Sequence, residues 1–483
     1  MKPSSPLSQE VWERTPAEAQ AYIRALEARV VALEATVQRL LERLRMDSHN
    51  ASPPPSSDPP ATSRPRRRTP SGRKPGGQPG HQGQTRALVP LEAVDVVLPV
   101  KPTHCSRCQN PLHGEDGQPQ RHQVTDLPPV QPVVTEYQLH SLVCPACGAT
   151  TRADLPVGGP TGGFGPRVQA SVALCTGAYH LSKRTTQDVM ADLFGIPLSL
   201  GTIANLEHAT VQALAAPVAE AQTYVRAQPI AYLDETGWRE RRTRAWLWVA
   251  VTAWVTVFAV RLSRGAKVVQ ELLGERFCGT LVTERWSAYN WYPTRWRQVC
   301  WAHLLRDFEA MIERGGRSQE IGEALREQAR QIFHWWHRVR AGTLTHAQFR
   351  IVIRPMRRHV ARLLKAGQTC GIVKTEGVCR EVLKVYDALW TFVRVEGVEP
   401  TNNVAERAIR PGVLWRKGSF GTQSGAGSRF VEVMMTVVAT LKQQHRNVLA
   451  YMTDACQAVY TGEPAPSLLP LHPAVHKRLS AAA

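Results

Sequence analysis

Between residues 229 and 300 the chain changes from helical periodicity to short apolar runs, and this change limits the possible folds most strongly. The runs are rich in Val, Leu, Ala and Trp and occupy residues 230–233, 245–251, 254–261, 280–283 and 298–300. Apolar runs of this length and composition are typical of buried strands. Helical, Arg-rich sequence follows from His303 to about residue 394, and a further helix begins near Asn403. We therefore expect an α/β core with a long helical insertion before its last helix.

Three acidic residues stand at the ends of these predicted elements. Asp234 follows the run 230–233, Glu284 follows the run 280–283, and Glu406 lies in the first turn of the helix that begins near Asn403. A buried strand fixes the position of an acid that ends it. Taken singly, each acid also fits a turn, a helix cap or a favourable charge at a helix N-terminus. If the strands are neighbours, the first two carboxylates face one another and Glu406 completes the cluster.

Three carboxylates that converge repel one another unless a cation lies between them. Oxygen donors of this kind select Mg²⁺ or Mn²⁺. Two such ions, about 3.5–4 Å apart, activate an attacking water or 3′-hydroxyl and stabilise the leaving oxygen. The pattern predicts phosphodiester transfer by Asp234, Glu284 and Glu406, and the order of the strands resembles a ribonuclease-H-like core with a mixed five-stranded sheet.

Four of the ten cysteines form two pairs, Cys105 with Cys108 and Cys144 with Cys147. Two residues between cysteines let both thiolates reach one tetrahedral zinc ion from a tight turn. We expect a structural Zn²⁺ site that stabilises a small module and performs no chemistry. A redox pair is the alternative, but two matched pairs argue against it. The first twenty residues contain no apolar run typical of a signal peptide, which favours a cytoplasmic, nucleoid-associated bacterial protein.

The formal net charge of +19 predicts an anionic partner. Nucleic acid is the commonest one, and an anionic membrane surface is the alternative, which no lipidation or anchor signal supports. Residues 47–90 are rich in Pro, Ser, Gly and Arg and predict a linker. We expect its basic side chains to contact DNA phosphates, although a solvated linker has the same composition; they are Arg66, Arg67, Arg68, Arg73 and Lys74.

Two helical features precede the core. Apolar residues at alternating steps of three and four in residues 17–46 predict a parallel two-stranded coiled coil, or else a helix packed on its own protein. Within residues 165–225, one helix ends at Gly195 and another begins at Ser199. A helix, a turn with Gly and a second helix are the pattern of a helix-turn-helix, and the alternative is a connector packed on the core.

Four motifs of the chain resemble the transposases of the insertion sequence 66 family. They are Asp-Glu-Thr-Gly-Trp-Arg (234–239), Arg-Trp-Ser-Ala-Tyr (285–289), Cys-Trp-Ala-His-Leu-Leu-Arg-Asp (300–307) and Pro-Thr-Asn-Asn-Val-Ala-Glu-Arg-Ala-Ile-Arg-Pro (400–411). The segment Lys-Pro-Gly-Gly-Gln-Pro-Gly-His (74–81) and the four-cysteine module also fit the layout of that family. The resemblance covers most of the chain.

This resemblance implies a DDE-type enzyme that cuts and joins DNA, a polynucleotidyl transferase or nuclease. The first Asp and the Glu of the family correspond to Asp234 and Glu406, whereas its second Asp is replaced here by Glu284. Glu reaches one methylene farther, and a displacement of about 1 Å can cost on the order of a hundredfold in rate. The sequence therefore fits an active transposase and also a DNA-binding relative, kept as a regulator or remnant. A nuclease that does not transfer strands is a third interpretation.

The same resemblance implies partners and further contacts. We expect double-stranded DNA, both transposon ends and target, a homodimer or larger assembly, and small accessory transposition proteins. His303 and Arg306 are candidates for contact with the scissile phosphate, although His303 also fits a packed helix N-terminus. Further DNA contacts are predicted around the third acid, at Arg407, Arg410, Arg416 and Lys417.

These features predict eight segments. They are a coiled-coil helix (1–46), a basic linker (47–90), a four-cysteine zinc module (91–160), a helical region with the helix-turn-helix (161–225), the strands of the core (226–303), a helical insertion (304–398), the C-terminal part of the core with the acidic helix (399–462) and a tail (463–483).

Overall fold

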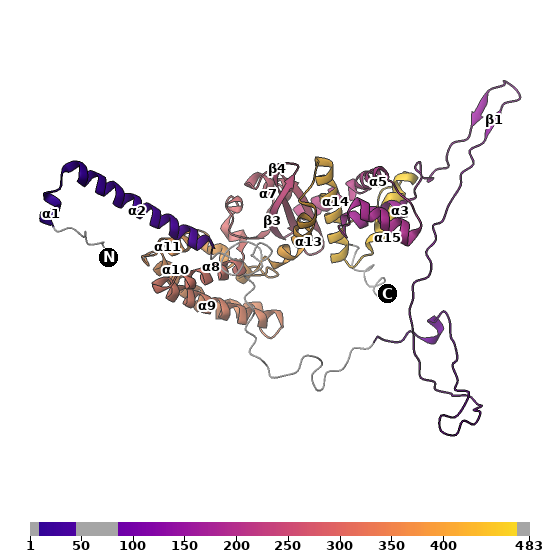
Figure 1. Ribbon diagram of the computed structural model, residues 1–483, viewed down its shortest axis with the longest axis horizontal. Helices are drawn as coiled ribbons and strands as arrows, with labels where there is room; N and C mark the ends of the chain where they lie inside the picture. The colour runs from indigo at the N-terminus through magenta and orange to yellow at the C-terminus, as the bar shows by residue number, and fades with distance from the viewer. Residues whose placement is uncertain (1–8, 45–85, 471–483) are drawn as a thin grey trace. The chain divides into compact units, whose positions relative to one another are not determined.

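The computed structural model describes residues 9–44 and 86–470 (Figure 1). The chain forms two compact units, one of residues Ser63–Val133 and one of Met1–Thr62 with Val134–Ala483. The described helices of the larger unit are α1 (Gln9–Glu13), α2 (Ala17–Leu44), α3 (Pro166–Gly177), α4 (Lys183–Phe194), α5 (Leu200–Ala213), α6 (Ala215–Arg226), α7 (Ala266–Leu273), α8 (Trp301–Glu313), α9 (Gly316–Arg340), α10 (His346–Gly367), α11 (Val373–Lys384), α12 (Thr391–Arg394), α13 (Asn403–Ser419), α14 (Gly425–Gln443) and α15 (Val448–Thr461). No helix within the described ranges is both long and apolar enough to cross a membrane.

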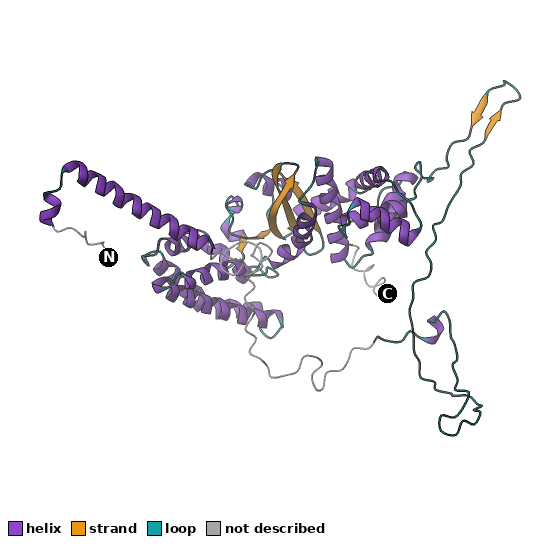
Figure 2. Cartoon of the chain, viewed as in Figure 1, coloured by secondary structure: helices purple, strands orange, loops and turns teal. Residues whose placement is uncertain are grey.

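A mixed five-stranded sheet forms the centre of the larger unit, as the sequence predicts (Figure 2). Its strands are β3 (Ile230–Glu240), β4 (Thr243–Val251), β5 (Thr256–Arg261), β6 (Thr280–Thr283) and β7 (Arg297–Val299). Their order is β5-β4-β3-β6-β7. The β3–β4 and β4–β5 pairs are antiparallel, and the β3–β6 and β6–β7 pairs are parallel. The two strands that carry Asp234 and precede Glu284 are therefore neighbours.

Two predicted strand ends differ from the structure. The strand predicted to begin at residue 254 begins at Thr256, because the backbone amide of Thr252 donates to the carbonyl of Val255 at 2.9 Å and closes a turn. The strand predicted to end at Cys300 ends at Val299, and Cys300 is the residue that precedes α8. Cys300 therefore lies at a strand-to-helix junction, where its side chain can face a site.

Asp234 does not end its strand, contrary to the prediction. The parallel pairing of β3 with β6 stops at Tyr232 and Val282, but β4 continues to pair with β3 up to Glu240 and Thr243. Because β4 still satisfies the backbone on one side, β3 remains extended beyond the end of β6. Asp234 thus lies inside β3, at the point where the other edge of the strand becomes free.

The sheet is covered by helices on both faces, which is why its strands read as continuous apolar runs. On one face, Tyr232 and Val249 pack with residues of α8 to α11 and α13, including Leu304 and Ile409. On the other face, alternate strand residues pack with α3, α5, α6, α7, α14 and α15. Side chains alternate between the faces of a strand, so Asp234 shares the face of Tyr232. The helices α8 and α13 cover that face.

The two helices predicted between residues 165 and 225 are present. Ser182 caps α4, Gly195 ends it with a φ of 65°, and Ser199 caps α5. α3 and α5 pack against α14 and α15 on the second face of the sheet, as expected of a connector that belongs to the core. A helix-turn-helix that reads DNA remains a prediction.

The predicted coiled-coil helix is a single helix, α2, in the described chain. Its apolar seam is largely exposed, with 44% to 58% of each side chain accessible at Leu26, Val30, Leu33 and Val37. Packing of α2 within its own chain thus leaves these side chains uncovered, and the coiled coil remains a prediction.

Candidate active site

The candidate site lies where the parallel strands of the sheet end. Asp234 and Glu284 are each two residues beyond the paired Tyr232 and Val282, so continuing the register places them opposite each other. Glu406 lies in the first turn of α13, and α13 packs on β3 and β4. Ligands of open α/β sheets bind at the carboxyl ends of the strands. The structure therefore brings the three predicted acids to one edge of the sheet.

Asp234 is buried among like charges. Its side chain is only 7% exposed, and its Oδ1 accepts a hydrogen bond from the backbone amide of Glu235 at 2.9 Å. Burial, and then repulsion from Glu284, Glu235 and Glu406, raises the pKa of Asp234 well above its ordinary value. A buried carboxylate beside other acids is unstable without a compensating positive charge, so this position is suited to a cation.

His303, the third residue of α8, lies between the two other acids. Its Nε2 is 2.8 Å from Glu284 Oε1, and its Nδ1 is 3.7 Å from Glu406 Oε1. Nε2 also lies 3.0 Å from Nη1 of Arg306. Because two lone pairs would repel at 2.8 Å, Nε2 carries a proton and donates it to Glu284. His303 is thus part of the site, and its predicted contact with a phosphate is not tested by these distances.

The positive charge of His303 and the negative charge of Glu284 stabilise each other. Burial alone would lower the pKa of His303, but its contacts with Cys300 and Glu284 outweigh burial and raise it to about 11. Burial alone would raise the pKa of Glu284, but His303, Arg306 and Arg264 lower it overall. The negative surroundings that favour a proton on His303 also favour a metal cation.

Two buried atoms of Glu406 and His303 have no hydrogen-bond partner among the described residues, and neither has Oδ1 of Asn402 at the start of α13. The first two are Oε1 of Glu406 and Nδ1 of His303. Buried polar atoms are rarely left unpaired unless something else satisfies them. Together with the repelled charge of Asp234, these atoms fit a divalent cation held by this cluster.

A second acid next to Asp234 is held by side chains from two other segments. Glu235 has a buried side chain, and its Oε1 forms an ion pair with Nη2 of Arg264 at 2.8 Å. The hydroxyl of Tyr289 donates to the other oxygen of Glu235. Arg264 also lies over the ring of Trp286, 4.1 Å from its centroid. These contacts tie the loop after Glu284 to β3, and they neutralise Glu235 without a metal.

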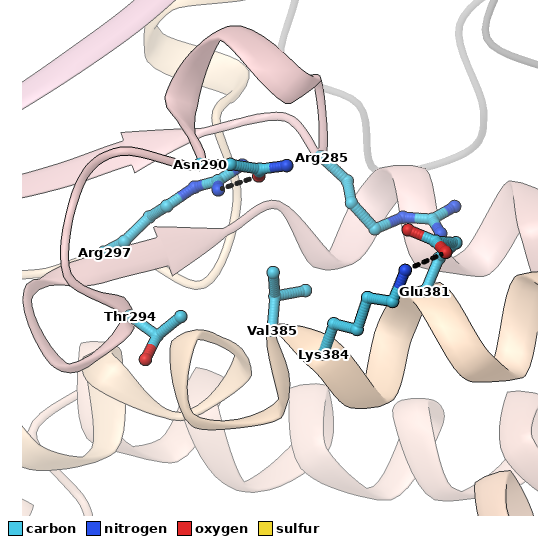
Figure 3. A pocket seen from close by; sticks show the side chains of 7 residues that line it. All are labelled: Arg285, Asn290, Thr294, Arg297, Glu381, Lys384 and Val385. Atoms are coloured by element: carbon cyan, nitrogen blue, oxygen red, sulfur yellow. Dashed lines mark hydrogen bonds and ion pairs between the residues drawn. The ribbon is translucent and has the colours of Figure 1, made fainter.

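Arg297 in β7 holds the same loop from the opposite side. Its side chain is fully buried and donates to Thr283 Oγ1 at 3.0 Å, Asn290 Oδ1 at 3.0 Å and the backbone carbonyl of Glu284 at 2.8 Å. Figure 3 shows Arg297 directed at Asn290. The two residues line a pocket that also involves Arg285, Thr294, Glu381, Lys384 and Val385. Arg297 therefore positions the backbone of Glu284 and contributes no carboxylate or base.

The four basic residues predicted near Glu406 differ in their surroundings. Arg407, Arg410 and Lys417 are exposed on α13. Arg416 is partly buried, and its Nη1 donates to Thr236 Oγ1 at 3.2 Å and to the carbonyl of Gly237. Arg416 thus attaches α13 to β3, whereas the exposed residues are accessible to a phosphate backbone.

Comparison with known proteins is consistent with this arrangement. Residues 161–429, more than half of the 483 residues, match the family described as "Transposase IS66 family". The chain belongs to the IS66 transposase family. Residues 102–148 match the zinc-finger binding domain of transposase IS66, and residues 4–87 match a family of unknown function, DUF6444.

One similar curated protein is the uncharacterized protein y4qI of Sinorhizobium fredii. It is 26% identical over 259 residues, which are 48% of this chain and 47% of that protein. The chain therefore spans about half the length of this relative.

In this member of the IS66 transposase family the two predicted cysteine pairs form equivalent turns. The amide of Cys105 donates to Asn110 at 2.9 Å and the amide of Gln109 donates to Cys105 at 3.0 Å. The same two bonds, both 2.8 Å, form around Cys144, from Cys144 to Ala149 and from Gly148 to Cys144.

Positive φ values of 60° at Gln109 and 71° at Gly148 close the two turns. Backbone amides lower the thiol pKa of Cys105 and of Cys144, which favours thiolates that can bind zinc. The strands β1 (Ser141–Val143) and β2 (Thr150–Arg152) flank the second turn. The first pair, with Cys108, belongs to the smaller unit and the second, with Cys147, to the larger unit, so a shared four-cysteine site remains a prediction.

The remaining predicted DNA contacts lie outside the described residues. These are Arg66, Arg67, Arg68, Arg73 and Lys74 of the linker. Their contact with phosphates remains a prediction.

Several residues of the site were not predicted from the sequence. Cys300 borders it, and the backbone amide of Asn402 donates to Cys300 Sγ at 3.1 Å. Asn402 also donates from Nδ2 to the carbonyl of Leu233 at 2.7 Å, which joins the start of α13 to β3. The spacing Cys300-x-x-His303 was a usable signal, because residues three apart share one face of a helix. The role of Arg297 had no such signal.

Proposed function

We propose that this chain is a DDE-type transposase that binds the ends of an insertion sequence, cuts them with divalent metal ions and transfers the strand. The cluster of Asp234, Glu284 and Glu406, with His303 between the last two, is the observation that carries this proposal. The order β5-β4-β3-β6-β7, with two antiparallel and two parallel pairs of neighbours, supports a ribonuclease-H-like core.

Asp234, Glu284 and Glu406 are the residues that would hold the ions, Mg²⁺ or Mn²⁺. When bound, such ions activate the attacking water or 3′-hydroxyl and stabilise the leaving oxygen. His303 keeps Glu284 oriented through its 2.8 Å contact. Arg306 adds positive charge beside it, next to the position proposed for the scissile phosphate. The protein itself supplies no covalent nucleophile in this scheme.

The exposed basic residues of α13 are proposed to bind DNA phosphates, and this contribution to binding does not depend on the base sequence. Phosphate contacts fix the register of a protein on a duplex. On α13, Arg407, Arg410 and Lys417 are exposed in the same helix as Glu406, so phosphates bound there lie near the acids. We assign Arg416 mainly a structural role, because its guanidinium already donates hydrogen bonds to β3. The linker and the zinc-binding module are proposed to add further contacts.

Two copies of the chain are proposed to associate through α2. The exposed seam of Leu26, Val30, Leu33 and Val37 has the heptad spacing that a second α2 covers in a coiled coil. Accessory transposition proteins remain an expectation from the family resemblance, and action at the nucleoid in the cytoplasm is proposed on the same ground.

A second candidate function is DNA binding without catalysis. It is favoured by Glu284, which stands where the family pattern has Asp and whose Oε1 is engaged by His303. In this case the chain acts as a regulator of transposition. Glu284→Asp separates the two functions because it restores the shorter side chain.

The test is metal-dependent nicking of a labelled duplex that carries the terminal repeat of the element. Wild type is compared with Asp234→Asn, Glu284→Asp and, as a control, Asp387→Asn, whose exposed carboxylate pairs with Arg357. We expect Mn²⁺-dependent nicking that Asp234→Asn abolishes and Asp387→Asn leaves intact.

Each other outcome is informative. Nicking only by Glu284→Asp supports the non-catalytic function for the natural chain. Binding of DNA with no nicking by any variant contradicts the catalytic proposal. Nicking without joining of a pre-cut end to a target plasmid would identify a nuclease that does not transfer strands.

A further inference from the structure

A second group of potential metal ligands borders the carboxylate cluster. Single ligand atoms of Cys300, His303 and Glu406 lie within 4.8 Å of one another. Cys300 and His303 come from the junction of β7 and α8, and Glu406 comes from the first turn of α13. The group thus shares Glu406 with the proposed catalytic site but adds a sulfur and a nitrogen donor.

The geometry of the two unpartnered atoms favours a bridging ion. His303 Nδ1 and Glu406 Oε1 are buried, lack hydrogen-bond partners within the described chain and lie 3.7 Å apart. This separation is too long for a hydrogen bond. Zinc binds nitrogen at about 2.0–2.1 Å and oxygen at about 2.0–2.2 Å, so two donors on one tetrahedral ion lie about 3.4 Å apart. One ion therefore satisfies both atoms without a large movement.

Hydrogen bonds from neighbouring groups orient these donor atoms for a metal ion. Nε2 of His303 donates to Glu284, so Nδ1 is the nitrogen that can bind a metal ion after it releases its proton. Metal-bound histidines almost always donate their other N–H to a carboxylate or carbonyl in this way. The amide of Asn402 donates to Cys300 Sγ at 3.1 Å, which fixes the position of this sulfur. The longer side chain of Glu284 thus has a use here, because its carboxylate orients His303.

We propose that Cys300, His303 and Glu406 bind Zn²⁺ at a site separate from the two cysteine turns. One sulfur, one nitrogen and one oxygen suit Zn²⁺, whereas Mg²⁺ requires oxygen ligands. Three protein ligands leave a fourth tetrahedral position for water. Because Zn²⁺ withdraws Glu406 from the carboxylate cluster, it inhibits the Mg²⁺-dependent reaction. This inhibition rests on the proposed function, but the binding of Zn²⁺ does not.

Binding is tested with Co²⁺, which takes the place of Zn²⁺ and absorbs light when bound to thiolate. Metal-free full-length chain is titrated as wild type and as the variants Cys300→Ser, His303→Gln and Glu284→Gln. Cys456→Ser is the matched control, since Cys456 is also buried but lies in α15. A double variant, Cys105→Ser with Cys108→Ser, identifies the absorption that depends on the first cysteine turn.

We expect the wild type to show an absorption band from cobalt bound to thiolate. The part of this band that depends on Cys300 should disappear in Cys300→Ser. The same part should persist in the double variant and in Cys456→Ser. His303→Gln should weaken Co²⁺ binding at this site at least tenfold. Glu284→Gln should weaken it about 10- to 100-fold, as is typical for loss of a partner behind a histidine ligand. Equal titrations of wild type and Cys300→Ser would overturn the proposal. If Cys300→Ser does not fold, unchanged binding by His303→Gln and Glu284→Gln overturns it instead.

Inhibition is measured separately from binding. Mg²⁺-dependent nicking is titrated with Zn²⁺, and each variant is compared with its own activity without Zn²⁺. We expect Cys300→Ser to require at least tenfold more Zn²⁺ for half inhibition, and an unchanged requirement contradicts the shared use of Glu406. If no variant nicks DNA, the proposed function fails while the Co²⁺ titration still decides whether the ion binds.

Discussion

Replacing Arg297 by methionine tests how the loop after Glu284 is held in place. The guanidinium of Arg297 is fully buried and donates three hydrogen bonds, to Thr283, Asn290 and the carbonyl of Glu284. Methionine fills a similar space but donates no hydrogen bond. The change therefore removes the donors and keeps most of the packing.

The magnitude follows from two opposing effects. Hydrogen bonds that involve a charged group contribute about 1.5–3 kcal/mol each, so three contribute about 4.5–9 kcal/mol. Burial lowers the pKa of Arg297 from 12.5 to about 10, and this fall corresponds to a destabilisation of about 3.4 kcal/mol. Methionine removes both effects. We expect Arg297→Met to lower the free energy of unfolding by about 1–6 kcal/mol.

Lysine in place of Arg297 separates charge from geometry. It keeps the buried charge, but a single ammonium group cannot reproduce the three bonds of the planar guanidinium. We therefore expect Arg297→Lys to be no more stable than Arg297→Met. Both should also lose activity, because the carbonyl of Glu284 loses its donor, and a displacement of about 1 Å costs on the order of a hundredfold in rate.

The assay is urea unfolding of the metal-free protein, followed by circular dichroism, together with the nicking assay. Arg330→Met is the control, because Arg330 is exposed on α9, where it pairs with the nearby Glu327 at 3.6 Å. Its stability should change by less than about 0.5 kcal/mol. A lysine variant as stable as the wild type would refute the reasoning, since charge alone would then be sufficient.

Two further predictions concern the backbone of the core and its buried charge. Gly421→Ala should lower the melting temperature, with a loss of about 1–3 kcal/mol, because Gly421 has a φ of 106° and a Cβ there would lie 2.2 Å from the carbonyl of Arg239. Gly418→Ala on α13 meets open space and should be neutral or stabilising, so equal melting temperatures of the two variants would contradict this. Asp234→Asn should raise the melting temperature of the metal-free protein and remove its further rise with Mn²⁺, because it deletes a buried charge that its acidic neighbours repel. The pKa of Asp234 is raised by folding, so the gain of the Asn variant should be present at neutral pH and should shrink as the pH falls and Asp234 takes up a proton. A gain that grows in acid would exclude this explanation.

The sequence predicted the three acids because each belongs to a local pattern. Asp234 and Glu284 follow apolar runs, and Glu406 lies in the first turn of a helix, so nearby residues alone identify them as candidates. The true end of β3 did not follow in this way. It depends on pairing with β4 up to Glu240 and Thr243, and a strand of the same local sequence without that partner would end where β6 ends.

The residues that position the acids could not be predicted from the sequence, because their contacts also depend on distant segments. Arg297 interacts with Thr283, Glu284 and Asn290 because β6 and β7 are neighbours and the loop between them folds back. Cys300 meets Glu406 only because α13, about one hundred residues later, packs on β3 and β4. Local propensity and spacing contain no information about such distant partners.

By itself, the sequence determined the order of strands and helices, the two cysteine pairs and the three candidate acids, because periodicity and short spacings are local properties. Only the tertiary structure decided that His303 stands between Glu284 and Glu406, and that Cys300 adds a sulfur donor beside them. The physical reason is that the packing of α8 and α13 on one face of the sheet sets these distances. Packing depends on the whole core, so no single segment of the chain specifies the site.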